Sequence, residues 1–222
     1  MSFNAVVFDM DGVLLDSMSE DEWKWDAVRK VIRSKGVDAD SLDKNTLGAI
    51  LGDQGYKKCI KACDNLGLSP KKVWTEVAQE TTLKRRQKIS DGDITLFDGA
   101  RNLIGDLHQE DIKMGIISNA PEDAVEATIE EFDLKKYVHF YMGVRSFEDL
   151  QARKPNPNHL EIAKIEIKRS PILYIGDAES DVIAANRADM KSAWLKRGNI
   201  EGDVQPDYSI NSLQKLKEIA IE

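Results

Sequence analysis

The sequence predicts an α/β protein: a parallel sheet covered by helices, with a block of helices inserted after the first strand. Two observations predict this. An isolated apolar run at Ala5–Phe8 precedes a long stretch, 17–90, that has helical periodicity and no convincing strand. Beyond it, short strand-like runs alternate with helical patterns, which implies parallel strands joined by right-handed crossovers. The expected core comprises 1–16 and 92–222, and the expected helical domain comprises 17–91.

Apolar residues at helical spacing predict four helices in the insertion. Their markers, in chain order, are Trp23, Ala27, Val28 and Val31; the segment 43–51; Tyr56, Cys59, Ile60 and Cys63; and Val73, Trp74, Val77 and Thr81. Glycines at 36, 52 and 67 end the first three helices, and Pro70 opens the fourth. Cys59 and Cys63 share one helix face, where we expect buried apolar residues rather than a disulfide or metal ligands.

The elements after the insertion alternate in type. The expected strands are 112–117, 138–142, 172–175, 192–195 and a short edge strand at 208–210. Four of the expected helices cover Ala100 to Leu107, Leu160 to Ile167, Val182 to Ala188 and Leu213 to Ala220. A further helix is opened by Pro121 and carries Val125, Ile129 and Phe132 on its apolar face. A sheet built from such segments carries its ligands at the carboxyl edge of its strands.

Composition narrows the possible partners. The 222 residues carry a net charge of −8 with a pI near 5.1, which disfavours binding to a nucleic-acid backbone. No apolar run approaches the roughly 20 residues needed to span a bilayer. The first strand begins without a preceding signal-type segment, so a cytoplasmic location is the default expectation. The sequence does not specify an oligomeric state.

Two aspartates and a glycine follow the first strand directly. Side chains two apart on an extended chain point the same way, so Asp9 and Asp11 are expected to face one site. Taken alone, this stretch fits a solvated turn equally well, because Asp and Gly are common turn residues.

Other polar residues follow the later strands. They are Ser118 and Asn119 after 112–117, Asp177 and Asp181 after 172–175, and Lys154 in a proline-rich loop. If these edges meet, four carboxylates share one small site, and a divalent cation is the natural means of keeping them ionised. Oxygen ligands without Cys or His suit Mg²⁺. A hydroxyl, an amide and a lysine suit a phosphate, so the set predicts phosphoryl transfer.

The sequence resembles the haloacid dehalogenase superfamily of phosphohydrolases. The resemblance rests on four pieces in the family's order: Asp9-Met10-Asp11-Gly12-Val13, Ser118-Asn119, Lys154-Pro155, and Gly176-Asp177 with Asp181. The helical insertion resembles the subclass with an α-helical cap, which includes phosphoglycolate phosphatases and β-phosphoglucomutase-like proteins. The resemblance implies a Rossmann-like three-layer core and a Mg²⁺-dependent phosphomonoester hydrolase acting on a small phosphorylated metabolite.

The resemblance also implies a role for each site residue. Asp9 would attack phosphorus and carry an aspartyl-phosphate, and Asp11 would serve as general acid and base. Mg²⁺ would be held by Asp9, Asp177 and the backbone carbonyl of Asp11, with Asp181 supporting the site from behind. Gly12, Ser118, Asn119 and Lys154 would hold the phosphoryl group. Relatives that cleave carbon–halogen bonds lack the aspartate at position 11, so its presence favours phosphate esters.

Two alternatives remain open. A sugar phosphomutase would use the same Asp9 but return the phosphoryl group to the sugar, and a non-catalytic binding module would share only the fold. Substrate choice should come from the insertion, where basic residues are expected to be solvated helix faces and tryptophans to pack in the core of the cap. These candidate contacts are Gln54, Lys57, Lys58, the run Lys84-Arg85-Arg86, Trp23 and Trp25.

Overall fold

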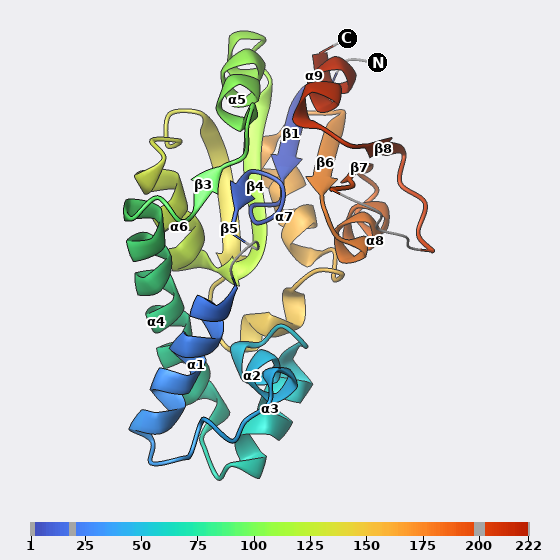
Figure 1. Ribbon diagram of the computed structural model, residues 1–222. Coiled ribbons are helices and arrows are strands. Elements are labelled where there is room, and N and C mark those ends of the chain that lie inside the picture. The colour runs from blue at the N-terminus through green and yellow to red at the C-terminus, as the bar shows by residue number, and fades with distance from the viewer. Residues whose placement is uncertain (1–2, 18–20, 198–202, 222) are drawn as a thin grey trace.

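A parallel sheet forms the centre of the upper part of the molecule (Figure 1), in a computed structural model that describes residues 3–17, 21–197 and 203–221. Within these residues the sheet has six strands in the order β5-β4-β1-β6-β7-β8, and each neighbouring pair is parallel. The strands are β1 (Ala5–Phe8), β4 (Lys113–Pro121), β5 (Val138–Val144), β6 (Ile172–Gly176), β7 (Lys191–Leu195) and β8 (Tyr208–Ile210). The predicted parallel sheet is confirmed.

Helices cover both faces of the sheet, as the alternation of side chains along β1 requires. Val6 and Phe8 belong to one apolar cluster, which includes residues of α5 (Ala100–Gln109), α6 (Glu122–Glu131) and α9 (Leu213–Ile221). Ala5 and Val7 belong to another, with residues of α7 (Asn158–Ile167) and α8 (Glu179–Arg187). The result is the expected three-layer α/β core.

The lower part of the molecule in Figure 1 contains α1 (Glu22–Ser34), α2 (Lys44–Leu51), α3 (Tyr56–Asn65) and α4 (Pro70–Ser90). These four helices pack around a second apolar cluster, which Val144, Phe147 and Leu150 join from β5 and the segment that follows it. Cys59 and Cys63 lie in this cluster as buried free thiols, as predicted. No helix among the residues described is long and apolar enough to cross a membrane.

A short antiparallel ribbon joins the two parts. Its strands are β2 (Leu15–Asp16) and β3 (Thr95–Leu96), which lie where the chain leaves the sheet region and where it returns. Two-residue strands carry too little pattern to be predicted. The pairing places both crossings of the chain side by side.

Two boundaries differ from prediction at places that matter for the site, and one short element was not predicted. Strand β4 continues through Ser118 to Pro121, so α6 begins at Glu122 rather than at the proline. Helix α8 begins at Glu179, three residues early, which places Asp181 in its first turn. A 3₁₀ helix, η1 (Glu148–Ala152), lies just before Lys154. At β4 the proline obscured the boundary, because pairing with Val144 of β5 carries the strand through Pro121.

Candidate active site

A cavity of about 370 Å³ lies between the carboxyl edge of the sheet and the helical block. Among the residues that line it are Asp9, Asp11, Ser118, Asn119, Lys154, Asp177 and Asp181, which is the predicted site set apart from Gly12. The structure therefore brings together polar residues from four distant pieces of chain. Their convergence follows from the parallel arrangement of β1, β4 and β6.

Three carboxylates crowd one end of the cavity. Asp9, Asp177 and Asp181 each offer an oxygen, and these atoms all lie within 4.8 Å of one another. Burial raises the pKa of Asp9 to about 8, Lys154 opposes the rise, and the two neighbouring carboxylates add to it. Burial and then the charge of Asp181 raise the pKa of Asp177 to about 6. A cation would relieve this repulsion, and an all-oxygen donor set fits a hard divalent metal ion.

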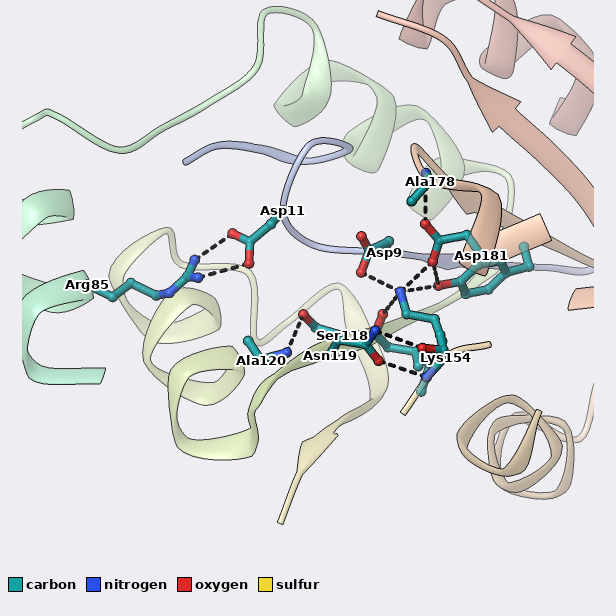
Figure 2. A network of polar contacts seen from close by, with 11 residues as sticks. Asp9, Asp11, Arg85, Ser118, Asn119, Ala120, Lys154, Ala178 and Asp181 are labelled. Carbon is teal, nitrogen blue, oxygen red and sulfur yellow. Dashed lines mark hydrogen bonds and ion pairs between the residues drawn. The ribbon is translucent and has the colours of Figure 1, made fainter. Parts of the chain in front are cut away.

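Lys154 provides the positive charge within this group. Its Nζ lies 2.7 Å from Oδ1 of Asp9, 2.5 Å from Oδ1 of Asp181 and 2.8 Å from the hydroxyl of Tyr174 (Figure 2). Burial disfavours the charged ammonium, but the two carboxylates outweigh it and raise the pKa of Lys154. Sequence reasoning missed Tyr174, because it stands inside an apolar strand and reads as a core residue.

Asp181 is already satisfied by protein donors. Its Oδ1 accepts hydrogen bonds from Lys154 and from the hydroxyl of Tyr174, the latter at 3.0 Å. Its Oδ2 accepts the backbone N–H of Ala178 at 3.0 Å, at the start of α8. Only 2% of the residue is exposed. These contacts favour a role in holding Lys154 over direct binding of a metal ion.

Gly12 makes the turn after β1 possible. Its φ is +80°, and a Cβ atom there would lie 2.0 Å from Oδ2 of Asp177, so a side chain at this position would strain the backbone and displace the Asp177 carboxylate. Its amide N–H donates to the carbonyl of Leu15 at 2.9 Å, so in this structure the amide serves the turn rather than the cavity. Nε of Arg197 donates to the Gly12 carbonyl at 3.0 Å and braces the same turn.

The end of β4 holds the loop that carries Lys154. The side-chain amide of Asn119 accepts the backbone N–H of Lys154 at 2.9 Å and donates to its carbonyl at 3.2 Å. Ser118 is buried, and its hydroxyl accepts the N–H of Ala120 at 3.1 Å. Asn119 therefore fixes the backbone of Lys154 against the end of β4.

Asp11 turns away from the other carboxylates. Figure 2 shows its side chain directed toward Arg85, on the side of Asp9 opposite to Lys154. Nη1 and Nη2 of Arg85 lie 2.7 and 2.9 Å from its two oxygens, and the hydroxyl of Ser17 donates to one of them. Burial raises the pKa of Asp11, but the charge and hydrogen bonds of Arg85 outweigh it and hold the pKa at about 2.

The expectation that Lys84-Arg85-Arg86 forms a solvated face is wrong for Arg85, whose side chain is only 4% exposed. Consecutive helical residues point about 100° apart, so a basic run on α4 spreads over several faces. Arg86 instead pairs with Glu130 and Glu131 on α6. A charge run in the sequence does not reveal which member faces the cavity.

Trp23 also departs from expectation. It lines the cavity and belongs to the apolar cluster of the sheet rather than to that of the helical block. Trp25 packs against the cluster of the block, as predicted. Gln54, Lys57 and Lys58 do not line the cavity; Gln54 bonds to Asn45, and the two lysines are exposed.

Comparisons with known proteins agree with the fold and with the motifs. Phosphoglycolate phosphatase of Salmonella typhi is 26% identical over 245 residues, covering 97% of this chain and 91% of that protein. The crystal structure of CbbY from Rhodobacter sphaeroides in complex with phosphate has a TM-score of 0.75 at 18% identity, covering 96% of each chain. A putative β-phosphoglucomutase from Thermotoga maritima has a TM-score of 0.66 at 18% identity, covering 99% of this chain and 98% of that one. Likeness at these identities shows the shared fold.

The family comparison covers most of the chain. The sequence pattern of haloacid dehalogenase-like hydrolases matches residues 6–195, a span that begins in β1 and ends with β7. It includes every predicted site residue and the helical block between β2 and β3. The chain is therefore an enzyme of the haloacid dehalogenase-like hydrolase family.

Proposed function

We propose that this enzyme is a Mg²⁺-dependent phosphatase that hydrolyses a small phosphomonoester through an aspartyl-phosphate on Asp9. The observation that carries the proposal is the grouping of Asp9, Asp177 and Asp181 around Lys154 in one cavity. The phosphatases among its relatives support a phosphate ester as substrate. The cavity volume of about 370 Å³ suits a small metabolite, of the phosphoglycolate or sugar phosphate type.

Asp9, Asp177 and the backbone carbonyl of Asp11 are the proposed ligands of Mg²⁺. When bound, the ion supplies charge that screens the Asp9 carboxylate from the anionic phosphoryl group. Lys154 stays beside Asp9 because Asp181 and Tyr174 hold its ammonium in place. The hydrogen bonds of Asn119 to the backbone of Lys154 add to this positioning.

The reaction would proceed in two steps. An oxygen of Asp9 attacks phosphorus, the bond to the alcohol oxygen breaks, and Asp11 gives that oxygen a proton. A water molecule then attacks phosphorus, Asp11 takes a proton from it, and phosphate leaves with the regeneration of Asp9. Lys154 and Ser118 would hold the phosphoryl oxygens through both steps.

We further propose that residues 17–91 act as a cap over residues 1–16 and 92–222. The cavity wall supports this division, because Leu51, Thr81 and Arg85 come from the helical block and face the sheet edge. The β2–β3 ribbon lies at both chain crossings and is the expected hinge. Closure of such a cap excludes water until the substrate is bound.

Release of phosphate from a panel of small phosphomonoesters, with Mg²⁺ and with EDTA, tests the proposal. We expect Mg²⁺-dependent release that is abolished by Asp9→Asn and retained by Asp64→Asn, a matched change at an exposed position. A hexose 1-phosphate separates the alternatives, since a mutase yields an isomerised sugar phosphate instead of free phosphate. Unchanged turnover in Asp9→Asn would exclude the mechanism.

A further inference from the structure

Arg85 is a buried cation whose guanidinium bonds to the residue proposed as general acid and base. Both of its terminal nitrogens donate to the carboxylate of Asp11, at 2.7 and 2.9 Å, and Ser17 donates to the same carboxylate. While these bonds last, Asp11 is turned toward α4 and away from Asp9 (Figure 2). The proposed mechanism needs the Asp11 carboxyl at the leaving oxygen, so the ion pair has to open.

Opening the pair leaves Arg85 in need of another anion. Its side chain is 4% exposed, and a buried guanidinium without a counterion is strongly disfavoured. The two parallel N–H groups of an arginine match a carboxylate or a phosphate, whereas a neutral group satisfies them poorly. A substrate can therefore release Asp11 most readily by bringing an anion of its own.

The surroundings of Arg85 fit an anion-binding subsite. Trp23 and Lys24 line the cavity together with Arg85, and the Arg85 guanidinium and the Lys24 ammonium lie 5.7 and 5.5 Å from the centre of the Trp23 ring. The indole Nε1 of Trp23 is buried and has no hydrogen-bond partner among the described residues, which leaves one donor available beside the arginine. The cavity is thus lined by carboxylates at the sheet and by basic side chains at α1 and α4.

We propose that Arg85 exchanges Asp11 for a second anionic group of the substrate, so that this group both binds at α4 and frees Asp11 for catalysis. The inference rests on the proposed phosphatase function and adds a substrate class, a phosphomonoester with a second carboxylate or phosphate. The exchange also predicts that the enzyme discriminates between charged and neutral substrate tails in kcat, because a substrate with a neutral tail leaves Asp11 bound to Arg85.

Matched substrates test the exchange. One pair is 2-phosphoglycolate and its amide, which has the same size but an uncharged tail, and the other is a hexose 1,6-bisphosphate and the corresponding 1-phosphate. For at least one pair we expect the wild-type enzyme to prefer the doubly anionic ester by about 100-fold or more in kcat/KM, with part of the difference in kcat.

Variants of α4 separate exchange from a merely structural role. Arg85→Gln should lose most activity toward the doubly anionic ester while its kcat for the neutral-tail ester rises, because Asp11 is no longer held. Arg85→Lys, which keeps the charge but not the paired N–H groups, should retain part of the preference. Arg86→Gln, on the neighbouring face, should leave both activities and their ratio unchanged, and unfolding midpoints verify that each variant folds.

Equal wild-type rates within both pairs would overturn the exchange, as would an Arg85→Gln variant that folds and loses both activities in proportion. These results differ from failure of the phosphatase proposal. That proposal fails if the wild-type enzyme hydrolyses none of the four esters with Mg²⁺, or if Asp9→Asn retains activity, and the exchange is then refuted with it.

Discussion

Replacing Asp9 by Asn should stabilise the metal-free protein although it abolishes catalysis. The carboxyl of Asp9 shares a buried site with Asp177 and Asp181, and its pKa is raised from 3.8 to about 8. At pH 7 it holds a proton that the unfolded chain has released. The cost of keeping this proton builds up from pH 3.8, where the unfolded carboxyl titrates, to pH 7, an interval of about 3.2 pH units. It lowers the free energy of unfolding at pH 7 by about 4 kcal/mol.

Asn resembles the protonated carboxyl in size and can still accept a hydrogen bond from Lys154. We therefore expect Asp9→Asn to raise the free energy of unfolding in EDTA at pH 7 by about 2–4 kcal/mol. For a chain of this size the unfolding midpoint should rise by about 5–15 °C. Denaturant unfolding followed by circular dichroism measures the first quantity, and thermal scans measure the second.

The stabilising effect of Asp9→Asn should depend on pH. A raised carboxyl pKa leaves stability intact below 3.8 and removes it as pH rises toward 8, so the advantage of Asn should shrink toward zero at pH 4. Mg²⁺ should stabilise wild type more than the variant, because the variant loses a proposed ligand. An Asn variant that is no more stable than wild type in EDTA at pH 7, or whose advantage persists at pH 4, would refute this reasoning.

Three further changes have expected outcomes. Gly12→Ala should lower kcat by about 100-fold or more and destabilise by about 1–3 kcal/mol, because the methyl group overlaps a carboxylate and φ is positive; steady-state kinetics and denaturant unfolding measure this. Tyr174→Phe removes the hydroxyl that bonds to both the Lys154 ammonium and Asp181. We expect the free energy of unfolding, measured with denaturant, to fall by about 1 kcal/mol and kcat to be reduced. The lowered pKa of Asp11 should add about 2 kcal/mol to the free energy of unfolding above pH 4, and this stability should be lost as pH falls toward 2. In Arg85→Gln, acid unfolding should show that this stability is already missing above pH 4.

The elements that the sequence predicted are those with strong local patterns. Strand β1 follows from an apolar run, and α4 follows from Pro70 and the apolar spacing after it. The site residues after β1, on β4 and after β6 could be predicted because the carboxyl ends of parallel strands meet at one edge. Each of these inferences needs only neighbouring residues and one rule of topology.

The residues that the sequence did not reveal depend on contacts between distant segments. Arg85 reads as part of a charged run, and only the packing of α4 against the cavity distinguishes it from Arg86. Tyr174 reads as apolar core, and its role comes from a lysine that lies 20 residues earlier in the chain. The hydrogen bond from the Gly12 amide to Leu15 likewise follows from the turn geometry after β1, which residue types alone do not specify.

The central claim is that the carboxylate of Asp9 accepts the phosphoryl group, and trapping the intermediate tests it most directly. A rapid acid quench during turnover of a phosphate ester with a radioactive phosphoryl group, followed by peptide mapping, should place the label on the peptide that contains Asp9. The same peptide of the Asp9→Asn variant should carry none. Label on a different residue, or turnover by the wild-type enzyme with no labelled protein at any quench time, would contradict the account.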